Sequence, residues 1–401
     1  MGRPALARRH GSCHPWSRAG PTLQRDSDLD NLTHALVGAA IAKAGAERAT
    51  PLALGTLVVA ANAPDIDILA FTAGEAFALS FRRGLTHGWP ALAVLPFVVT
   101  GCMLAWDRWV RRRARPELPP ARFAAILLLS VVGLATHPTL DWLNIYGMRW
   151  SLPFDGSWSY GDALFIIDPW IWLVLGGGLA AVSSPTRRGW VGWSLLVMAT
   201  TALMLLGVGG PPAVVWMMAV GVIIGLRLHF GPLVRGRRRA MAAVCVAVAG
   251  YIVAMLASDR AAGSLVMAEA SARGLDATDV LVAPVRGNPL RGEVEVQTPD
   301  GYVPGTFRWT GRPRVTLRPE ALVPLRDVGD LDEAMAERIL EVATRRPPLS
   351  HYLVWARYPY VRVSPMEDGW LVHVGDVRYD DEPAAGELGG MSALVTPSEV
   401  P

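Results

Sequence analysis

The chain has 401 residues, of which 51% are hydrophobic and only 18% are charged, and its formal net charge is +3. This composition is too apolar for an average soluble protein, the length allows two domains, and the 3 widely separated cysteines indicate neither a disulfide framework nor a cysteine-type zinc site. The net charge divides into about +10 for residues 1–257 and about −7 for residues 258–401, which predicts a basic membrane part and an acidic aqueous part, and gives no reason to expect nucleic-acid binding.

The first 28 residues are polar, rich in arginine and without a long apolar core, so they do not resemble a secretory signal. We expect residues 1–28 to be a disordered or mis-assigned extension, with translation beginning at Leu29 in "LDNLTHALVG". A short apolar stretch, 32–46, follows and is marginal for spanning a bilayer.

Apolar runs of roughly 17–25 residues, the length that crosses a bilayer, then follow one another to residue 257. We predict an all-α polytopic membrane bundle with about 7–8 membrane segments. The bundle is expected to comprise a metal-site helical domain, 29–182, and additional transmembrane helices, 183–257. The predicted spans are 51–70, 90–106, 121–140, 165–182, 190–208, 212–229 and 240–257.

Basic loops predict the orientation of these spans. Arginine-rich loops at 107–117, 183–189 and 227–239 alternate with weakly basic turns, as they must if every second loop is cytoplasmic. The last span then delivers residues 258–401 to the extracytoplasmic side.

The segment 258–401 is predicted to be a small α+β extracytoplasmic domain that can cover the outer end of the bundle. The run "DLDEAMAERILEVATRR" at 330–346 predicts an amphipathic helix, and the last twenty or so residues are expected to be disordered. Alternating runs separated by Gly, Pro and Asp predict strands in "RGEVEVQT", "PRVTLRP", "HYLVWARYPYVRVS" and "GWLVHVGDVRYD".

Ionisable side chains of the membrane part fall at the outer ends of five predicted segments, and such residues at membrane depth indicate a functional site. Their types suit a divalent metal, because imidazole and carboxylate bind zinc, manganese or iron. Isolated histidines near helix ends are usually not ligands, but the three histidines of residues 29–182 share one side. The candidates are His34, Asp65, Asp67, His87, His137 and Asp141, with Asp168 as a further candidate.

The local spacing supports this hypothesis. His137 and Asp141, four residues apart, share one helical face, and Pro138 is expected to end or kink that helix. Asp65 and Asp67 lie on one side only if the backbone is extended, and the proline between Ala63 and Asp65 favours a break there. A threonine precedes each histidine and can supply a hydrogen bond that orients the ring.

The stretches "THALVGAAIAKAG", "PDID", "RRGLTHGWPALAVLP" and "THPTLDWLNIYG", within residues 30–175, resemble the bacterial inner-membrane proteins described as membrane-bound metal-dependent hydrolases. The same group, YbcI/YdjM-like, is also described as LexA-binding and inner-membrane-associated. The resemblance implies a multi-pass protein of the inner membrane. It also implies a metal site at His34, Asp65, Asp67, His87, His137 and Asp141.

The order His, Asp, His, then HxxxD is also similar to zinc-dependent phospholipase C and related single-strand nucleases. The sequence departs from them because it lacks a second HxxxE/D motif and the N-terminal tryptophan ligand. One or two metals are therefore expected rather than three.

The leading hypothesis is metal-assisted hydrolysis of a phosphodiester, phospholipid or lipid-linked substrate, with zinc as the expected ion and manganese or iron as alternatives. Asp67 is the candidate general base or supporting partner, and Arg82 and Arg83 are candidates for holding a phosphate oxygen. The alternatives are a non-enzymatic, metal-stabilised scaffold or regulator that binds an unidentified protein, and, ranked last, metal transport. Membrane lipids are the expected surroundings.

Overall fold

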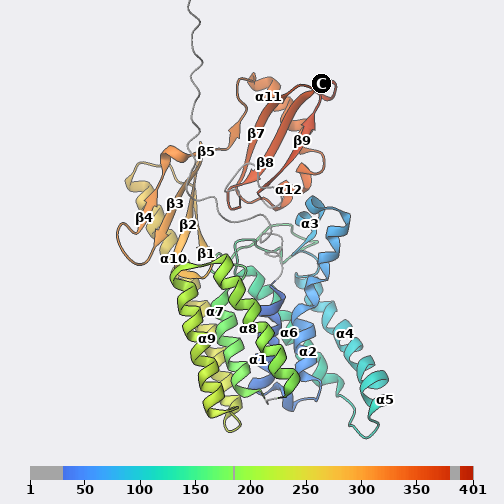
Figure 1. Ribbon diagram of the computed structural model, residues 1–401. Coiled ribbons are helices and arrows are strands. Elements are labelled where there is room, and N and C mark those ends of the chain that lie inside the picture. Colours follow the sequence, from blue (N-terminus) through green and yellow to red (C-terminus); the bar gives the residue numbers. More distant parts are fainter. Residues whose placement is uncertain (1–29, 184–185, 380–388, 401) are drawn as a thin grey trace, which may run out of the picture.

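The computed structural model describes residues 30–183, 186–379 and 389–400, and consists of a helical bundle joined to a region of β-sheet (Figure 1). The predicted extension 1–28 lies outside the described residues. Within those residues, 6 helices are long and apolar enough to cross a membrane: Ala53–Ala73, Trp89–Ala114, Phe123–Trp142, Arg187–Gly207, Gly210–Phe230 and Arg237–Ala272. The predicted helical bundle with a C-terminal β-containing part is confirmed, whereas the predicted count of about 7–8 spans is not.

Two short apolar helices account for the difference. Helices α1 (Asn31–Ala44) and α7 (Pro169–Val182) have 14 residues each, which is about 21 Å of helix against about 30 Å of bilayer hydrocarbon. The predicted span 165–182 loses its first turn because the chain stays irregular up to Asp168, whose carboxylate caps α7. Both helices lie inside the bundle, where they pack against one another and against α10 (Arg237–Ala272).

The second segment breaks where the sequence predicts a break, but not into extended chain. Helix α2 (Ala53–Asn62) is followed directly by a 3₁₀ helix, η2 (Ala63–Ala73). Successive residues of a 3₁₀ helix turn by about 120°. Asp65 and Asp67 therefore leave the backbone in different directions, and Ile66 between them is exposed.

Glycines bring α1 and α6 (Phe123–Trp142) close to α2. A Cβ atom at Gly38 would lie 2.8 Å from the Leu57 carbonyl oxygen, and one at Gly133 would lie 2.8 Å from the Ala60 Cβ. His34 precedes Gly38 by one turn, and His137 follows Gly133 by one turn. These close approaches carry both imidazoles to the end of α2 at which η2 begins.

Helix α6 continues past Pro138 to Trp142, so of the two outcomes predicted for this proline, an end or a kink, the helix end is wrong. The chain can continue because the Pro138 ring needs only the loss of one backbone hydrogen bond and a local adjustment. His137 and Asp141 therefore stay on one regular helical surface.

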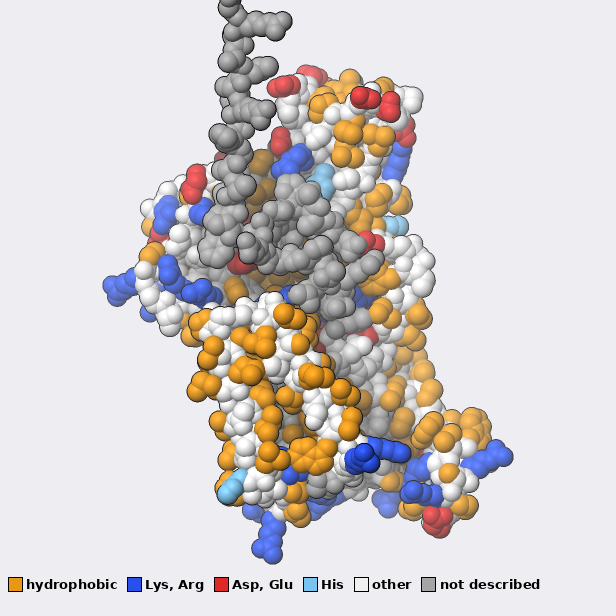
Figure 2. All heavy atoms as spheres, viewed as in Figure 1, with side chains coloured by type: hydrophobic (Ala, Val, Ile, Leu, Met, Phe, Trp, Pro, Cys, Tyr) orange, Lys and Arg blue, Asp and Glu red, His pale blue; other side chains and the backbone are white. Residues whose placement is uncertain are grey.

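The other helices of the bundle present large apolar side chains outward, and Figure 2 shows this apolar surface between two charged ends. Helix α10 has 36 residues and runs without interruption across residue 257, the predicted boundary of the C-terminal domain. Besides α10, the remaining helices of the bundle and the short turns that connect them are α3 (Glu75–Phe81), α4 (Trp89–Trp106), α5 (Arg112–Ala114), α8 (Arg187–Gly207), α9 (Gly210–Phe230), η1 (Ala46–Arg48) and η3 (Asp107–Arg111).

The C-terminal part contains two sheets. The first has the order β1-β2-β3-β4, with β5 paired to β3, and all its pairs are antiparallel. The second has the order β6-β7-β8-β9, in which only the β6–β7 pair is parallel. The strands are β1 (Asp279–Val285), β2 (Asn288–Thr298), β3 (Gly301–Arg308), β4 (Val315–Leu317), β5 (Val323–Pro324), β6 (Arg326–Asp327), β7 (Pro359–Met366), β8 (Gly369–Asp376) and β9 (Gly390–Val395).

Helices cover both sheets. The end of α10 packs on the first sheet, and α11 (Glu333–Thr344) and α12 (Leu349–Trp355) pack on the second. Two short 3₁₀ turns, η4 (Pro319–Ala321) and η5 (Pro397–Glu399), complete the region.

Two predictions for this region are wrong. Residues 351–355, predicted as part of a strand, lie in α12, because Leu349, Tyr352 and Trp355 recur at helical spacing and are buried together. The predicted disordered end contains β9, which pairs along β8 and buries Val395. The rest of that predicted disordered end, 381–388 and 401, lies outside the described residues.

Candidate metal centre

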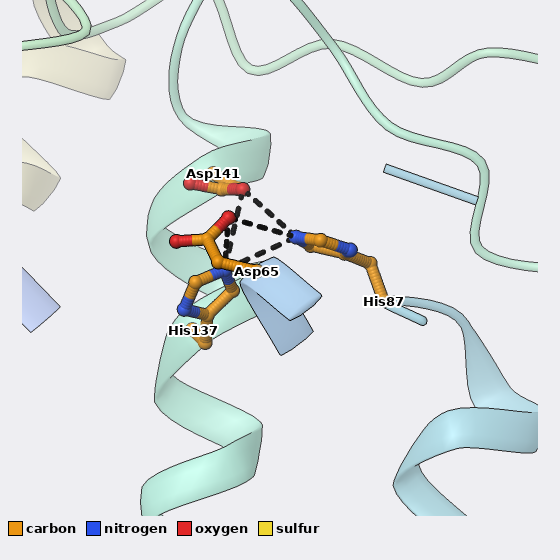
Figure 3. Close-up of side chains that lie close together, drawn as sticks. All are labelled: Asp65, His87, His137 and Asp141. Carbon is orange, nitrogen blue, oxygen red and sulfur yellow. Dashed lines mark hydrogen bonds and ion pairs between the residues drawn. The ribbon is translucent and has the colours of Figure 1, made fainter. Parts of the chain in front are cut away.

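Four predicted ligands meet at the end of the bundle that faces the sheets. Asp65 comes from the start of η2, His87 from the turn before α4, and His137 and Asp141 from the end of α6. All four are buried, and one ligand atom from each lies within 4.8 Å of the others. Figure 3 shows the four side chains pointing toward one another.

Several distances between these atoms are close to those around a single ion, and His87 Nε2 also lies 3.8 Å from Asp65 Oδ1. His87 Nε2 lies 3.1 Å from His137 Nε2 and 3.3 Å from Asp141 Oδ2. His137 Nε2 lies 3.6 Å from Asp141 Oδ2 and 3.6 Å from Asp65 Oδ1. Two atoms bound at 2.0–2.2 Å to one tetrahedral ion are about 3.3–3.6 Å apart. The cluster can therefore hold a metal ion.

Hydrogen bonds at Nδ1 of His87 and of His137 favour the tautomer in which Nε2 is unprotonated and can bind a metal. His137 Nδ1 lies 2.6 Å from the Ala61 carbonyl oxygen, which can only accept, so this nitrogen carries a proton. His87 Nδ1 lies 2.9 Å from Thr86 Oγ1 and 3.3 Å from a carboxylate oxygen of Asp67. In the neutral rings, the Nε2 lone pairs of His87 and His137 then face each other and repel. A proton or a cation between the two nitrogens removes this repulsion.

Asp67 lies behind His87 rather than among the four. One of its oxygens accepts from the Arg83 backbone N–H at 3.0 Å and from the Thr86 hydroxyl at 3.0 Å, and the other is 3.4 Å from Arg82 Nε. A carboxylate placed behind a histidine in this way orients the ring and raises its basicity. The 3₁₀ conformation of η2 is what separates Asp67 from Asp65.

His34 touches the cluster through Asp141. Its Nε2 lies 3.3 Å from Asp141 Oδ1, while Asp141 Oδ2 faces His87 and His137. Its ring stacks on that of His137, with centroids 3.8 Å apart. His34 thus lies beside the four-residue cluster, on the opposite oxygen of Asp141.

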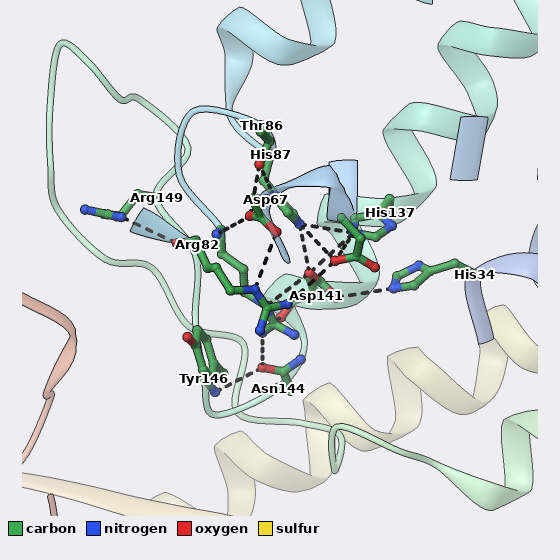
Figure 4. Close-up of polar contacts among 12 residues, drawn as sticks. His34, Asp67, Arg82, Thr86, His87, His137, Asp141, Asn144, Tyr146 and Arg149 are labelled. Atoms are coloured by element: carbon green, nitrogen blue, oxygen red, sulfur yellow. Dashed lines mark hydrogen bonds and ion pairs between the residues drawn. The ribbon is translucent and has the colours of Figure 1, made fainter. Parts of the chain in front are cut away.

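The two predicted phosphate-binding arginines are buried and already paired (Figure 4). Arg82 contacts Asp67 and lies 3.8 Å from Asp65 Oδ1. Arg83 Nε lies 3.1 Å from Asp141 Oδ2, and the Arg83 backbone has φ of 52°, a conformation that costs a non-glycine residue energy. Both side chains neutralise carboxylates of the cluster.

A cavity of about 20 Å³, enough for one water molecule, adjoins the cluster. His34, Arg83 and Asp141 line it together with apolar side chains, among them Leu140 and Phe165. Asp168 also lines this cavity, but its carboxylate caps α7 and accepts from the Tyr251 hydroxyl at 2.8 Å. None of the ion pairs among the described residues joins Asp168 to the four-residue cluster.

Several residues around the centre carry no motif that identifies them from sequence. The Asn144 side chain accepts from Arg83 Nη1 at 2.8 Å, and the Arg83 guanidinium lies over the Tyr146 ring at 4.5 Å. Arg149 donates to the backbone oxygens of Ser80 and Arg82. Of the three threonines that precede histidines, only Thr86 contacts the neighbouring ring among the described hydrogen bonds.

Residues 29–211 match the family described as YdjM inner membrane protein. The match covers every candidate ligand and confirms the family resemblance carried by the sequence motifs. No curated protein and no solved structure matches the chain.

Proposed function

Since residues 29–211 belong to the YdjM inner membrane protein family, we propose that this protein is a membrane-bound metal-dependent hydrolase. Asp65, His87, His137 and Asp141 hold a divalent ion, for which zinc is the first choice because imidazole nitrogens and carboxylate oxygens are among its usual ligands. The observation that carries the proposal is the approach of two imidazole Nε2 atoms to 3.1 Å between two carboxylates.

When bound, the ion supplies Lewis-acid polarisation of an ester or phosphoryl oxygen. The surrounding residues have separate roles in this proposal. Asp67 and Thr86 hold the His87 ring, and the Ala61 carbonyl holds the His137 ring. Arg83 pairs with Asp141 and lines the cavity, whereas Arg82 pairs with Asp67 and lies near Asp65.

The cavity adjoining the cluster also supports hydrolysis. It lies on the Asp141 side of the centre and is lined by polar groups and by apolar residues of α6 and of the segment before α7. It is large enough for one water molecule, the second reactant of hydrolysis, and too small for a substrate. We favour phosphodiester, phospholipid or lipid-linked substrates because the centre lies at one end of a bundle of apolar helices.

The proposed location of the centre is the extracytoplasmic face of the inner membrane. Lys and Arg side chains gather at the end of the bundle away from the sheets (Figure 2). The loops concerned are those around Arg111–Arg115, Arg187–Arg188 and Arg235–Arg239. An excess of arginine marks cytoplasmic loops, and this supports the proposal that the sheets and the centre lie on the other side.

One observation favours a second function, a metal-stabilised scaffold or regulator. The cluster offers four protein ligands, and structural zinc sites usually have four protein ligands and no open position. A catalytic centre needs a further position, which the cavity beside Asp141 can provide.

The test is metal analysis of the detergent-purified protein, followed by a panel of phosphodiester, phosphomonoester and carboxylic ester substrates. The hydrolase proposal expects one or two zinc ions per chain and metal-dependent turnover that is lost in Asp141→Ala. Stoichiometric metal without turnover of any class would favour the scaffold, and absence of bound metal after growth with zinc, manganese and iron would reject both.

A further inference from the structure

The C-terminal sheets contact the metal centre through a short segment that follows α6. This segment, residues 144–146, leaves α6 three residues after Asp141 and enters the space between the two sheets. Ile145 packs with Tyr302, Tyr358 and Tyr360, and Tyr146 packs with residues of the second sheet and its helices.

Arg378 fixes the backbone of this segment. Its guanidinium is fully buried, and its Nη1 donates to the Ile145 carbonyl oxygen at 2.6 Å. The same guanidinium bonds both oxygens of Asp376 at 3.0 and 2.8 Å, and lies over the Trp355 ring at 4.9 Å. Asp376 in turn accepts from the backbone N–H groups of Arg357 and Tyr358. Arg378 is therefore held by the second sheet and α12 while it holds Ile145.

The segment then fixes Arg83. Asn144 Oδ1 accepts from the Tyr146 backbone N–H at 3.0 Å and from Arg83 Nη1 at 2.8 Å. The Tyr146 ring lies between Trp355, with centroids 5.2 Å apart, and the Arg83 guanidinium at 4.5 Å. Arg83 Nε completes the connection at 3.1 Å from Asp141 Oδ2. Figure 4 shows Asn144 and Tyr146 on the side of the cluster away from His137.

We infer that the C-terminal sheets are part of the metal centre, and that Arg378 is a positioning residue for the ligand Asp141. It acts through the 144–146 segment and Arg83. This inference rests on the proposed metal site. Side chains that orient a metal ligand typically contribute about 10–100-fold to metal affinity. The inference gives the sheets a role in the chemistry of a site on the helical bundle.

The test measures zinc affinity of the full-length protein in detergent, by competition with a chelator of known affinity. Arg378→Lys keeps the positive charge beside Asp376 but loses the forked contact with both Asp376 and Ile145. The matched control is Arg346→Lys, because Arg346 also lies in the C-terminal part and pairs with a carboxylate, Glu399, at 2.5 Å without touching the 144–146 segment. The inference expects zinc affinity to fall by about 10-fold in Arg378→Lys and to change less than about twofold in the control.

A double-mutant cycle distinguishes an effect of Arg378 on Asp141 through Arg83 from a general loss of stability of the fold. If Arg378 acts through Arg83, adding Arg378→Lys to Arg83→Lys should cost less than about twofold in zinc affinity. If the loss of zinc affinity in the double variant equals the product of the losses in the two single variants, the inference is overturned. Asn144→Ala, which removes the acceptor shared by Arg83 and Tyr146, provides the same test if Arg378→Lys does not fold.

The outcome for the unchanged protein distinguishes the two proposals. Absence of zinc, manganese and iron binding by the unchanged chain would reject the metal centre itself and this inference with it. Zinc binding that is the same in the unchanged chain, Arg378→Lys and Asn144→Ala would reject only the role of the sheets.

Discussion

The Nε2 atoms of His87 and His137 lie 3.1 Å apart, although 50 residues separate these histidines in the chain. The Nδ1 atom of each ring is held from behind, by the Ala61 carbonyl oxygen in one case and by Thr86 and Asp67 in the other. This arrangement points both lone pairs at one place between Asp65 and Asp141. Four predictions follow from it and from the packing around it.

Replacing His137 by alanine should abolish tight zinc binding, because the change removes one of four ligands. The loss of affinity should exceed the roughly 10–100-fold that removal of a supporting residue costs. His229→Ala is the control, since His229 lies in the last turn of α9 and makes an edge-to-face contact with Phe230. Elemental analysis of both purified variants makes the comparison. Equal zinc content in the two would contradict the ligand assignment.

Asp67→Asn should weaken zinc binding without unfolding the protein. The amide keeps the shape of the side chain but loses the negative charge behind His87, and the expected cost is about 10–100-fold in affinity. Asp155→Asn, in an exposed turn where Asp155 bonds Ser157, serves as the control. Chelator competition measures both. If Asp67→Asn binds zinc as tightly as the control, the supporting role of Asp67 is wrong.

Gly133→Ala should destabilise the bundle, because its Cβ would lie 2.8 Å from the Ala60 Cβ and 3.0 Å from the Leu57 carbonyl oxygen. Overpacking of this kind typically costs about 1–3 kcal/mol. Gly101→Ala is matched to it, since no atom lies within 4 Å of a Cβ at Gly101 in α4. Thermal unfolding in detergent should show a lower midpoint only for Gly133→Ala. A similar midpoint for both variants would argue against the close approach of α6 and α2.

Stability of the second sheet should fall in acid because of Asp376. Burial alone would raise the pKa of this carboxyl, but the Arg378 charge and hydrogen bonds from Arg378 and Arg357 outweigh burial and hold the pKa below its usual value. The unfolded carboxyl titrates near pH 3.9. The stabilisation is therefore present above about pH 4 and is lost as the pH falls through the lower, folded pKa.

Asp376→Asn tests this assignment. The variant should be less stable at neutral pH, and its unfolding free energy should depend less on pH below about pH 5 than that of the unchanged protein. Near-ultraviolet circular dichroism, to which Trp355 and Trp370 contribute, can follow the transition. Parallel pH profiles for the two proteins would mean that Asp376 does not carry the effect.

Much of the candidate centre follows from residue type and spacing. Histidines and aspartates at the ends of apolar runs indicate a shared site, and the His137–Asp141 spacing predicts their common face. The sequence does not show that Asp65 joins the cluster while Asp67 lies behind His87. This difference depends on the 3₁₀ geometry of η2, which Pro64 permits but does not specify. The position of His34 depends likewise on how closely α1 approaches α2.

The fold shows the same limit. Long apolar runs identify the six helices that can span a membrane, but the start of α7 depends on the Asp168 cap and on an irregular segment before it. Helix α12 has the aromatic and β-branched composition of a strand, and only burial of one face against the second sheet makes it helical. The contact of Arg378 with Ile145 joins residues 233 positions apart, which no local pattern encodes.

Helix α10 has one further consequence. Its 36 residues extend over about 54 Å, and the bilayer hydrocarbon is about 30 Å thick. The part that packs on the first sheet is continuous with the part that packs in the bundle, so lipid thickness and helix tilt set the height of the sheets above the membrane surface. We therefore expect the acyl-chain length of a reconstituted bilayer to change the contact between the sheets and the 144–146 segment.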